Sequence, residues 1–384
     1  MTPRPHYDVA VVGAGVFGAW SAYLIRRTGA SVILIDQYGA GNKRSSSGGE
    51  TRVMRTGYGP DDIYSRSATR SLKLWRDLGE QVEQTLFHCT GVLWLAREQD
   101  SYSMNTLATF ERTNVAFERL TPTRLERRFP QIALGQSTWA ILETKAGVLM
   151  AKQGVRAVVE AAKRDGATYI EESVLPPTGD GSLKSVVTTG GAHITAGTFV
   201  FGCGPWLPKM FPEFLGKLIH VTRQEVFYFG VPAGDHRFAP PAMPVWIDFN
   251  DLVYAIPDVA GCGLKIAIDA HGSEFDPDTG DRAATREGLA AVRKYLSLRV
   301  PALADAPLLG SEVCQYENTS NGDFLIDRHP TLDNVWLVGG GSGHGFKHGP
   351  AIGEYVVKRI SGGTDVEPRF SLTSKARRQR RNVY

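Results

Sequence analysis

The sequence is poor in cysteine and has no cluster of metal ligands. Its 384 residues include four cysteines, none in a CxxC pair or in the paired spacing of a disulfide framework. The nine histidines show no ligand spacing with acids or cysteines. We therefore expect reduced thiols and no metal site.

A membrane-spanning or secretory segment is missing as well. The uncharged run 9–25 is interrupted by three glycines and is short for a membrane span. It lacks the basic region and small-residue cleavage site of a signal peptide, and the chain does not end in a Ser-Lys-Leu peroxisomal address. These absences predict a cytoplasmic protein that does not bind a membrane.

An excess of one charge is also absent. Lys and Arg number 43 against 40 Asp and Glu, and five of the basic residues lie in the tail 375–381 with no acid among them. The rest of the chain is near neutral, unlike the basic surface of a nucleic-acid-binding protein. The tail is expected to be solvated, with contact to an anionic partner as the alternative.

The residues that are present are typical of a loop-rich globular α/β or α+β protein. The chain has 42 glycines and 21 prolines, and 42% of its residues are hydrophobic. It contains no internal repeat, low-complexity linker or heptad run. Its length favours about two domains.

The N-terminus carries a strand, a glycine-rich loop, a helix and a second strand. The apolar, β-branched run 7–12 leads into the GxGxxG loop 13–18, and a helix is expected over 19–27. The next expected strand, 31–35, stops at an acidic residue. This context predicts a dinucleotide site, although the motif alone does not separate FAD from NAD.

Each conspicuous residue of this fingerprint has a physical task. Gly13 permits a tight turn, Gly15 lets the backbone approach a pyrophosphate, and Gly18 allows close packing of helix on strand. The helix N-terminus offers N–H groups to the anion. Asp36 is placed to accept a hydrogen bond from a ribose hydroxyl.

A second glycine-rich loop lies near the C-terminus. An expected strand, 334–338, runs into the loop 339–347, and a helix is expected from about 350 to 360. Pro350 suits the first helical turn, and Lys347 adds a cation beside the positive end of the helix. The pair would suit flavin carbonyls or a substrate carboxylate. A plain strand-to-helix turn is the alternative.

An expected strand at 264–269 places a lysine opposite an apolar face. Positions 264, 266 and 268 are apolar, whereas Lys265 and Asp269 share the other face with an alanine. The two readings of Lys265 at this stage are a functional cation and simple solvent exposure.

Four further segments follow the N-terminal fingerprint: residues 46–55, 262–265, 314–316 and 343–347. Together these motifs resemble the monomeric sarcosine oxidase and N-methyltryptophan oxidase group of the D-amino-acid-oxidase-like flavoproteins. The resemblance covers essentially the whole chain, and it implies an FAD cofactor and a monomer.

The resemblance also implies an α/β fold (mixed α+β) of two lobes. A Rossmann-like, discontinuous FAD-binding domain is expected from residues 1–86, 147–218 and 322–384. A second, substrate domain built on a large mixed β-sheet is expected from residues 87–146 and 219–321.

Patterns in the middle of the chain agree with such a sheet. Residues 155–163 have the periodicity of an amphipathic helix, and 168–170 and 198–206 are strand-like. The last segment resembles a later FAD-contacting strand of the family, and Val174 matches the position that covers the adenine. Ordinary sheet strands are the alternative.

In the family, a cysteine sulfur bonds to the 8α-methyl carbon of the flavin, and Cys314 matches that position. A free thiol is the alternative. Cys89, Cys203 and Cys262 are expected to be small buried residues. The full set of implied cofactor contacts is Gly13, Gly15, Val16, Phe17, Gly18, Asp36, Ser46, Arg52, Val174, Cys314, Gly343, Gly345, Phe346 and Lys347.

The resemblance implies a cationic substrate site. Arg55 and Lys347 match the pair that grips a substrate carboxylate, which suits a guanidinium fork and an ammonium. Lys265 matches the oxygen-activating lysine of the family. Thr51 and Arg52 match positions near the flavin, where Arg52 would stabilise negative charge on the reduced ring.

Other matched positions line the substrate cavity or depart from the family. Tyr254 and Tyr316 match cavity aromatics, with ordinary half-buried tyrosines as the alternative. Asp269 stands where sarcosine oxidases have histidine, Glu317 where a small hydroxyl residue is common, and Gly48 where a histidine is often found. The two acids would either neutralise nearby cations or receive a cationic or hydroxyl group on a substrate larger than sarcosine.

The resulting hypothesis is an FAD-dependent amine oxidase. It would convert an α-amino acid, N-methylated or otherwise secondary, to an imine, with O2 reduced to hydrogen peroxide. Tyr254, Tyr316 and Asp269 join Lys265, Arg52 and Thr51 as expected catalytic residues. A dehydrogenase with another electron acceptor, a primary amino acid oxidase, a non-catalytic flavoprotein and an NAD-linked dehydrogenase are the alternatives.

Overall fold

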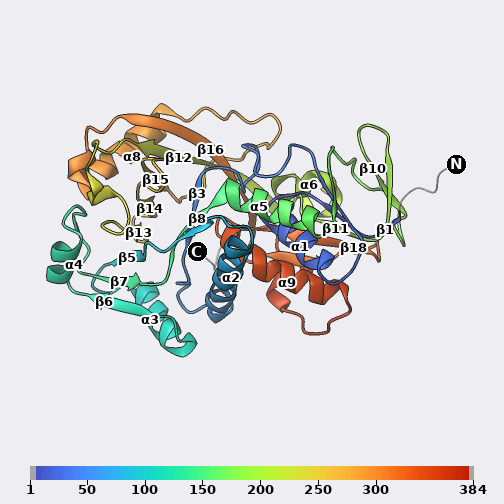
Figure 1. Cartoon of the computed structure of the whole chain (residues 1–384), viewed down its shortest axis with the longest axis horizontal. Helices are drawn as coiled ribbons and strands as arrows, with labels where there is room; N and C mark the ends of the chain where they lie inside the picture. The colour runs from blue at the N-terminus through green and yellow to red at the C-terminus, as the bar shows by residue number, and fades with distance from the viewer. Residues whose placement is uncertain (1–5, 380–384) are drawn as a thin grey trace.

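The computed structural model describes residues 6–379, which are organised around two large β-sheets and a small one (Figure 1). Helices pack on the sheets, so the mixed α/β fold predicted from the sequence is confirmed. No helix within 6–379 is both long and apolar enough to cross a membrane.

The seven-stranded sheet has the order β17-β18-β11-β1-β2-β9, and β10 pairs with β11. β1 is parallel to β2 and β11, and β18 continues the parallel set beside β11. The carboxyl ends of these strands therefore lie at one edge of the sheet, and their loops meet there. The strands are β1 (His6–Val12), β2 (Val32–Asp36), β9 (Thr168–Glu171), β10 (Ser185–Val187), β11 (His193–Phe201), β17 (Leu325–Arg328) and β18 (Val335–Gly339).

Both faces of this sheet are buried. Val9 and Val11 pack against a layer of helices that includes α1, α5 and α9, whereas Ala10 and Val12 face α6 and α7. Burial on both sides explains why β1 is continuously apolar rather than alternating. The helices are α1 (Val16–Arg26), α2 (Asp62–Gln81), α5 (Ala151–Arg164), α6 (Leu207–Met210), α7 (Pro212–Leu215) and α9 (Gly349–Ile360).

The eight-stranded sheet has the order β16-β12-β15-β14-β13-β5-β7-β6. It is antiparallel except where β13 runs parallel to β5. Helices α4 and α8 pack on one face and α3 on the other. The elements are β5 (Val92–Ala96), β6 (Phe117–Leu120), β7 (Trp139–Glu143), β12 (Ile219–Phe229), β13 (Val245–Asp248), β14 (Val253–Ile256), β15 (Leu264–Ile268), β16 (Leu308–Thr319), α3 (Ser101–Thr113), α4 (Pro122–Arg128) and α8 (Arg286–Arg299).

A third sheet is small and has three strands. It consists of β3 (Thr51–Met54), β8 (Gly147–Met150) and β4 (Phe87–His88), with β8 in the centre. β3 forms the later part of the 46–55 segment, and β8 leads directly into α5.

The sheets draw their strands from separate parts of the chain. The seven-stranded sheet uses residues 6–36, 168–201 and 325–339, and the eight-stranded sheet uses 92–143 and 219–319. The predicted domain pieces alternate in the same order, and their boundaries stay a prediction.

Two helices begin earlier than expected. α1 begins at Val16 rather than at 19, so Gly18 lies in its first turn, and α5 begins at Ala151 rather than at 155. Glycine disfavours helix interiors, which made both starts look like loop. In α1 the close approach to the preceding loop overrides that preference.

The expected burial of three cysteines is wrong for one of them. Cys89 is exposed because it follows the two-residue strand β4 at a surface turn, and Cys203 and Cys262 are half-buried. None of the four cysteines forms a disulfide bond within residues 6–379.

The solvated tail also needs a correction. Lys375 is buried, and its Nζ donates to the carbonyls of Arg369 (2.6 Å) and Asp323 (3.2 Å). These carbonyl oxygens compensate the buried ammonium for the loss of water. The charge pattern of the tail alone does not reveal them. Arg377 and Arg378 are exposed, and residues 380–381 lie outside the described part of the chain.

Candidate active site

One cavity of about 850 Å³ runs from the loop after β1 to the loop after β18 and on to β14 and β15. Nearly every residue predicted for the site lines it. These are Gly13, Gly15, Val16, Phe17, Asp36, Ser46, Arg52, Arg55, Val174, Tyr254, Lys265, Asp269, Cys314, Tyr316, Glu317, Gly343, Gly345, Phe346 and Lys347. The two exceptions, Gly18 and Thr51, lie directly behind the lining.

The glycine loop after β1 forms a close-packed cradle. A Cβ on Gly18 would lie 1.8 Å from the carbonyl oxygen of Gly13, and Gly13 itself has φ +101°. Any side chain at either position would displace backbone. The loop is held by Asp36, whose Oδ2 accepts from the Ala14 N–H at 2.7 Å. Burial raises the pKa of Asp36.

The second glycine loop packs directly on the first. A Cβ on Gly345 would lie 2.7 Å from the Phe17 ring and 2.8 Å from Gly341, and one on Gly343 would lie 2.7 Å from Tyr316. The two helix-entry loops therefore share one wall of the cavity. A long cavity with two such backbone cradles and an acid at the end of β2 fits FAD.

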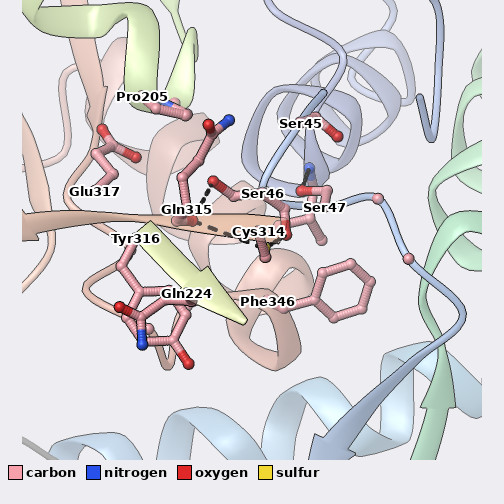
Figure 2. A pocket seen from close by; sticks show the side chains of 18 of the residues that line it. Ser45, Ser46, Ser47, Pro205, Gln224, Cys314, Gln315, Tyr316, Glu317 and Phe346 are labelled. Atoms are coloured by element: carbon pink, nitrogen blue, oxygen red, sulfur yellow. Dashed lines mark hydrogen bonds between the residues drawn. The ribbon is translucent and has the colours of Figure 1, made fainter. Parts of the chain in front are cut away.

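Cys314 lies on β16 beside a fixed positive charge. Arg52 Nη2 is 3.6 Å from its sulfur and donates to the carbonyls of Ser46 (2.8 Å) and Gly48 (2.9 Å). Figure 2 shows Cys314 between Ser46 and Phe346, with the Ser46 hydroxyl bonded to the Gln315 carbonyl at 2.8 Å. The thiol thus faces the cavity at a point where the chain is tightly fixed.

Lys265 is buried and points into the cavity, which excludes simple solvent exposure. It is 2% exposed, and its Nζ donates to the carbonyl of Thr51 at 2.9 Å. Its neighbours Leu264 and Ile266 face the core under α8, as the alternation predicts. Burial and the charge of Arg52 lower the pKa of Lys265 to about 7.

Arg55 and Lys347 meet at one end of the cavity. Lys347 Nζ donates to the Tyr58 hydroxyl (2.8 Å) and to the carbonyl of His344 (2.9 Å). The Arg55 guanidinium lies 4.2 Å from the centre of the Tyr58 ring and 5.1 Å from that of Trp94. Burial and the charge of Arg55 hold the pKa of Lys347 well below its ordinary range.

Tyr254, Tyr316 and Asp269 form a polar group on the wall of this end. Tyr316 donates to Asp269 Oδ1 at 2.6 Å, and Tyr254 pairs across the sheet with Ala267. Burial raises the pKa of both tyrosines, so their hydroxyls keep their protons. Asp269 lies close enough to Arg55 and Lys347 for its negative charge to favour the charged form of both.

Glu317 lies apart from these residues. Consecutive residues of a strand point to opposite faces, and Figure 2 shows Tyr316 and Glu317 on opposite sides of β16. Its carboxyl group packs against Gly339 and lies beside the backbone N–H groups of Gly340 and Gly341, which favour its charged form. Burial raises its pKa to about 7, and Oε1 has no hydrogen-bond partner within the described chain. The structure thus places Glu317 beside the loop after β18, across the strand from Tyr316.

Sequence reasoning missed a buried glutamate that holds Arg55 in place. Glu143, at the end of β7, accepts from the Thr56 N–H (2.7 Å), the Thr56 hydroxyl (2.6 Å) and the Trp94 indole (2.6 Å). It also accepts from the Gly57 N–H at 3.1 Å, so it fixes the segment after Arg55. No local motif marks Glu143, because its partners lie up to 87 residues away in sequence.

Tyr58, His344 and His348 were missed as well. They pack behind Lys347, with Tyr58 and His348 outside the cavity lining. The motif 343–347 pointed to Lys347 and contains His344, but nothing in it marked Tyr58 or His348. Within residues 6–379, no group of three or more His, Cys, Asp or Glu side chains is arranged to hold a metal ion.

Comparison with known proteins agrees with this architecture. Residues 8–359 match the DAO family, described as FAD dependent oxidoreductase. The chain is 30% identical to a monomeric sarcosine oxidase from Bacillus sp. (strain B-0618), over 91% of this chain and 90% of that protein. It is 28% identical to an N-methyl-L-tryptophan oxidase from Yersinia pestis (strain Pestoides F), over 91% of this chain and 93% of that one.

The fold is also similar to that of a solved structure, an L-proline dehydrogenase from P. horikoshii. The TM-score is 0.81 at 22% identity, with 96% of this chain and 97% of that chain covered. The predicted resemblance is therefore confirmed, and this chain belongs to the DAO family of FAD-dependent oxidoreductases, together with the monomeric sarcosine oxidases.

Proposed function

We propose that this protein oxidises an α-amino acid with a secondary amine to the corresponding imine and passes the electrons to O2, which forms hydrogen peroxide. One observation carries the proposal: the buried Lys347 and Lys265 and the half-buried Arg55 line the same cavity that the two glycine loops enclose. The similarity of the chain to sarcosine and N-methyltryptophan oxidases supports oxidation of a CH–NH bond.

Arg55 and Lys347 would bind the substrate carboxylate. The Arg55 guanidinium and the ammonium of Lys347 can both form charge-assisted hydrogen bonds with a carboxylate, and a bound carboxylate favours the charged form of Lys347. Holding the carboxylate there orients the carbon next to nitrogen for loss of its hydrogen. FAD, when bound, supplies the acceptor for that hydride.

Lys265 would act in the oxygen reaction. Its ammonium is buried, held by the Thr51 carbonyl and close to the charge of Arg52. A fixed positive charge in a site shielded from water stabilises negative charge as O2 is reduced. Water would then hydrolyse the imine outside the redox step.

Cys314 would carry the flavin covalently. Its sulfur lies on the cavity wall beside Arg52, where a thiolate has a positive neighbour. To test this, the purified protein is denatured in acid and freed of small molecules. Flavin colour and the mass of one FAD on the polypeptide would support attachment, and a Cys314→Ser variant should release its flavin. Colourless polypeptide from the unmodified protein would refute it.

The substrate class is tested by a screen of N-methylated, cyclic and primary α-amino acids, each followed by flavin bleaching without oxygen and by peroxide release with oxygen. Bleaching confined to secondary amines with a free carboxylate, together with peroxide, is the expected result. Bleaching by primary amino acids alone would overturn the secondary-amine assignment.

A dehydrogenase is the second candidate, because the fold is shared with an L-proline dehydrogenase. In that case flavin bleached by substrate would remain bleached for long after oxygen is admitted and recover with an artificial electron acceptor. Rapid recovery with oxygen favours the oxidase.

A further inference from the structure

A continuous chain of hydrogen bonds leads away from the substrate end of the cavity. Lys347 Nζ donates to the Tyr58 hydroxyl at 2.8 Å, and that hydroxyl lies 2.7 Å from His348 Nε2. His348 Nδ1 lies 2.9 Å from the Ser67 hydroxyl on α2. Tyr58 and His348 are 1% and 0% exposed, whereas Ser67 is half-buried and brings the chain to the surface.

Every group in this chain can both give and take a proton. A tyrosine hydroxyl and a serine hydroxyl each donate one hydrogen bond and accept others, and a neutral imidazole donates at one nitrogen and accepts at the other. The chain therefore has two orientations. With charged Lys347, hydrogen bonds run from Lys347 to Tyr58 to His348 to Ser67, and with neutral Lys347 they run the opposite way.

His344 cannot serve as a second exit. Its Nδ1 is 3.2 Å from the Tyr58 hydroxyl, but its Nε2 lies 2.9 Å from the carbonyl of Gly322. A carbonyl only accepts, so a neutral His344 carries its proton on Nε2, and its Nδ1 has no proton to pass to Tyr58. The route through His348 is the one that passes a proton onward.

The surroundings of Lys347 make its charge depend on what the cavity contains. Burial disfavours the ammonium, and the charge of Arg55 acts in the same direction, whereas Asp269 and Glu143 favour it. Tyr58 and the His344 carbonyl complete the shell around Nζ. A bound carboxylate adds a negative charge at short range, which favours the protonated lysine.

We propose that Ser67, His348 and Tyr58 form a proton relay that charges Lys347 when a substrate carboxylate binds and discharges it when the product leaves. The inference rests on the proposed function, because it needs a carboxylate at Arg55 and Lys347. With the carboxylate on the cavity side of Nζ, the proton reaches the nitrogen from the Tyr58 side.

The proton transfers balance. Ser67 passes its hydroxyl proton to His348 Nδ1 and takes one from water. His348 passes its Nε2 proton to the Tyr58 oxygen, and Tyr58 passes its own proton to Lys347 Nζ. Lys347 alone gains a proton and a charge, His348 changes tautomer, and release of product runs the same steps in reverse.

The relay is tested on the flavin-containing protein with acetate, a carboxylate that has no amine to oxidise. Rapid mixing in weakly buffered solution at mildly alkaline pH follows binding by the flavin absorbance and proton uptake by a pH indicator. The protein is expected to take up one proton for each acetate bound, and Lys347→Met is expected to take up none.

Two variants interrupt the relay in different ways. Tyr58→Phe removes the hydroxyl, and His348→Gln keeps hydrogen-bonding groups at the same place but does not exchange protons readily between them. Each should still bind acetate and still take up the proton at equilibrium, but about tenfold more slowly or worse. Ser67→Val, at the half-buried end, should slow uptake in the same direction with little effect on the core.

Tyr64→Phe is the matched control. Tyr64 is also buried and lies against the Tyr58 ring, but its hydroxyl bonds to Asp323 (2.6 Å) rather than to the relay. It should leave the uptake rate unchanged. Uptake at the unmodified rate in Tyr58→Phe and His348→Gln would overturn the relay.

The outcomes separate the two proposals. Acetate that binds without proton uptake refutes the relay and leaves the carboxylate site standing. Acetate that fails to perturb the flavin at any concentration refutes the carboxylate site and the relay that depends on it.

Discussion

The two ends of the cavity are built on different principles. The end near β1 is made of backbone: Gly13, Gly18 and Gly345 leave space that any side chain would fill. The end near β15 is made of side chains, where Arg55, Lys347 and neighbouring groups are held by partners far apart in sequence. The first end tolerates no added atoms, and the second depends on charge and position.

This difference predicts different consequences of mutation. Changes in the glycine cradle should remove the cofactor outright, because backbone cannot move aside cheaply. Changes in the cation end should leave the flavin bound and alter one kinetic step each.

The largest effect is expected from Gly18→Val. A Cβ there would lie 1.8 Å from the Gly13 carbonyl oxygen, so the loop must rearrange. The protein should purify with little or no flavin, measured as the ratio of flavin to protein absorbance. Gly310→Ala is the control, since a Cβ there meets nothing within 4 Å. A fully flavinylated Gly18→Val protein would contradict the backbone character of this end.

The next effect concerns Lys265→Met, which removes a charge while filling a similar volume. Reoxidation of the reduced flavin by O2 should slow by about 10²–10³-fold, whereas reduction by substrate without oxygen should change little. Rapid-mixing absorbance measures the two half-reactions separately. Equal slowing of both would contradict a role for Lys265 in the oxygen step.

Arg55→Lys should weaken substrate binding by about 10- to 100-fold, because a point charge replaces a bidentate fork. The expected change is in the dissociation constant measured from the rate of anaerobic flavin reduction at increasing substrate. Flavin content should be unchanged. Loss of flavin in this variant would contradict the division into a cofactor end and a substrate end, because it would show that Arg55 is also needed to retain the cofactor.

A pH profile gives a smaller effect. Lys265 has a pKa of about 7, lowered by burial and Arg52, so its ammonium is present at low pH and lost as pH rises. The rate of flavin reoxidation should therefore fall with rising pH. The midpoint of this fall should lie at or above pH 7, because negative charge on the reduced flavin raises the pKa of Lys265. The Lys265→Met variant should show no such fall. A rate that rises with pH in the unmodified protein would have the wrong sign.

The smallest effects are expected from variants of Asp269 and Glu317, which test whether each acid belongs to the substrate end or to the cofactor end of the cavity. Asp269→Asn should change substrate affinity by about severalfold and leave the flavin spectrum alone, because Asp269 bonds Tyr316 on the substrate side. Glu317→Gln should shift the flavin absorbance or its retention and leave substrate affinity alone, because Glu317 contacts the loop after β18. The reverse pattern would place Glu317 with the substrate, as the sequence first suggested.

The sequence alone was enough to predict the cofactor end. Strand, glycine loop, helix and acid are contiguous, and each follows from local rules of conformation that do not need the rest of the chain. The same local reasoning predicted that Lys265 shares a face with Asp269. Applied to β16, strand alternation would also have separated Tyr316 from Glu317.

Only the tertiary structure decided the rest. Glu143 on β7 fixes the segment after Arg55. His348 contacts Ser67, which is 281 residues away in the sequence. The buried Lys375 donates to carbonyls 6 and 52 residues away. Burial and charge at such places depend on which distant segments the two sheets bring together. Residue type and spacing determine which groups are available, and the packing of the sheets determines which of them meet.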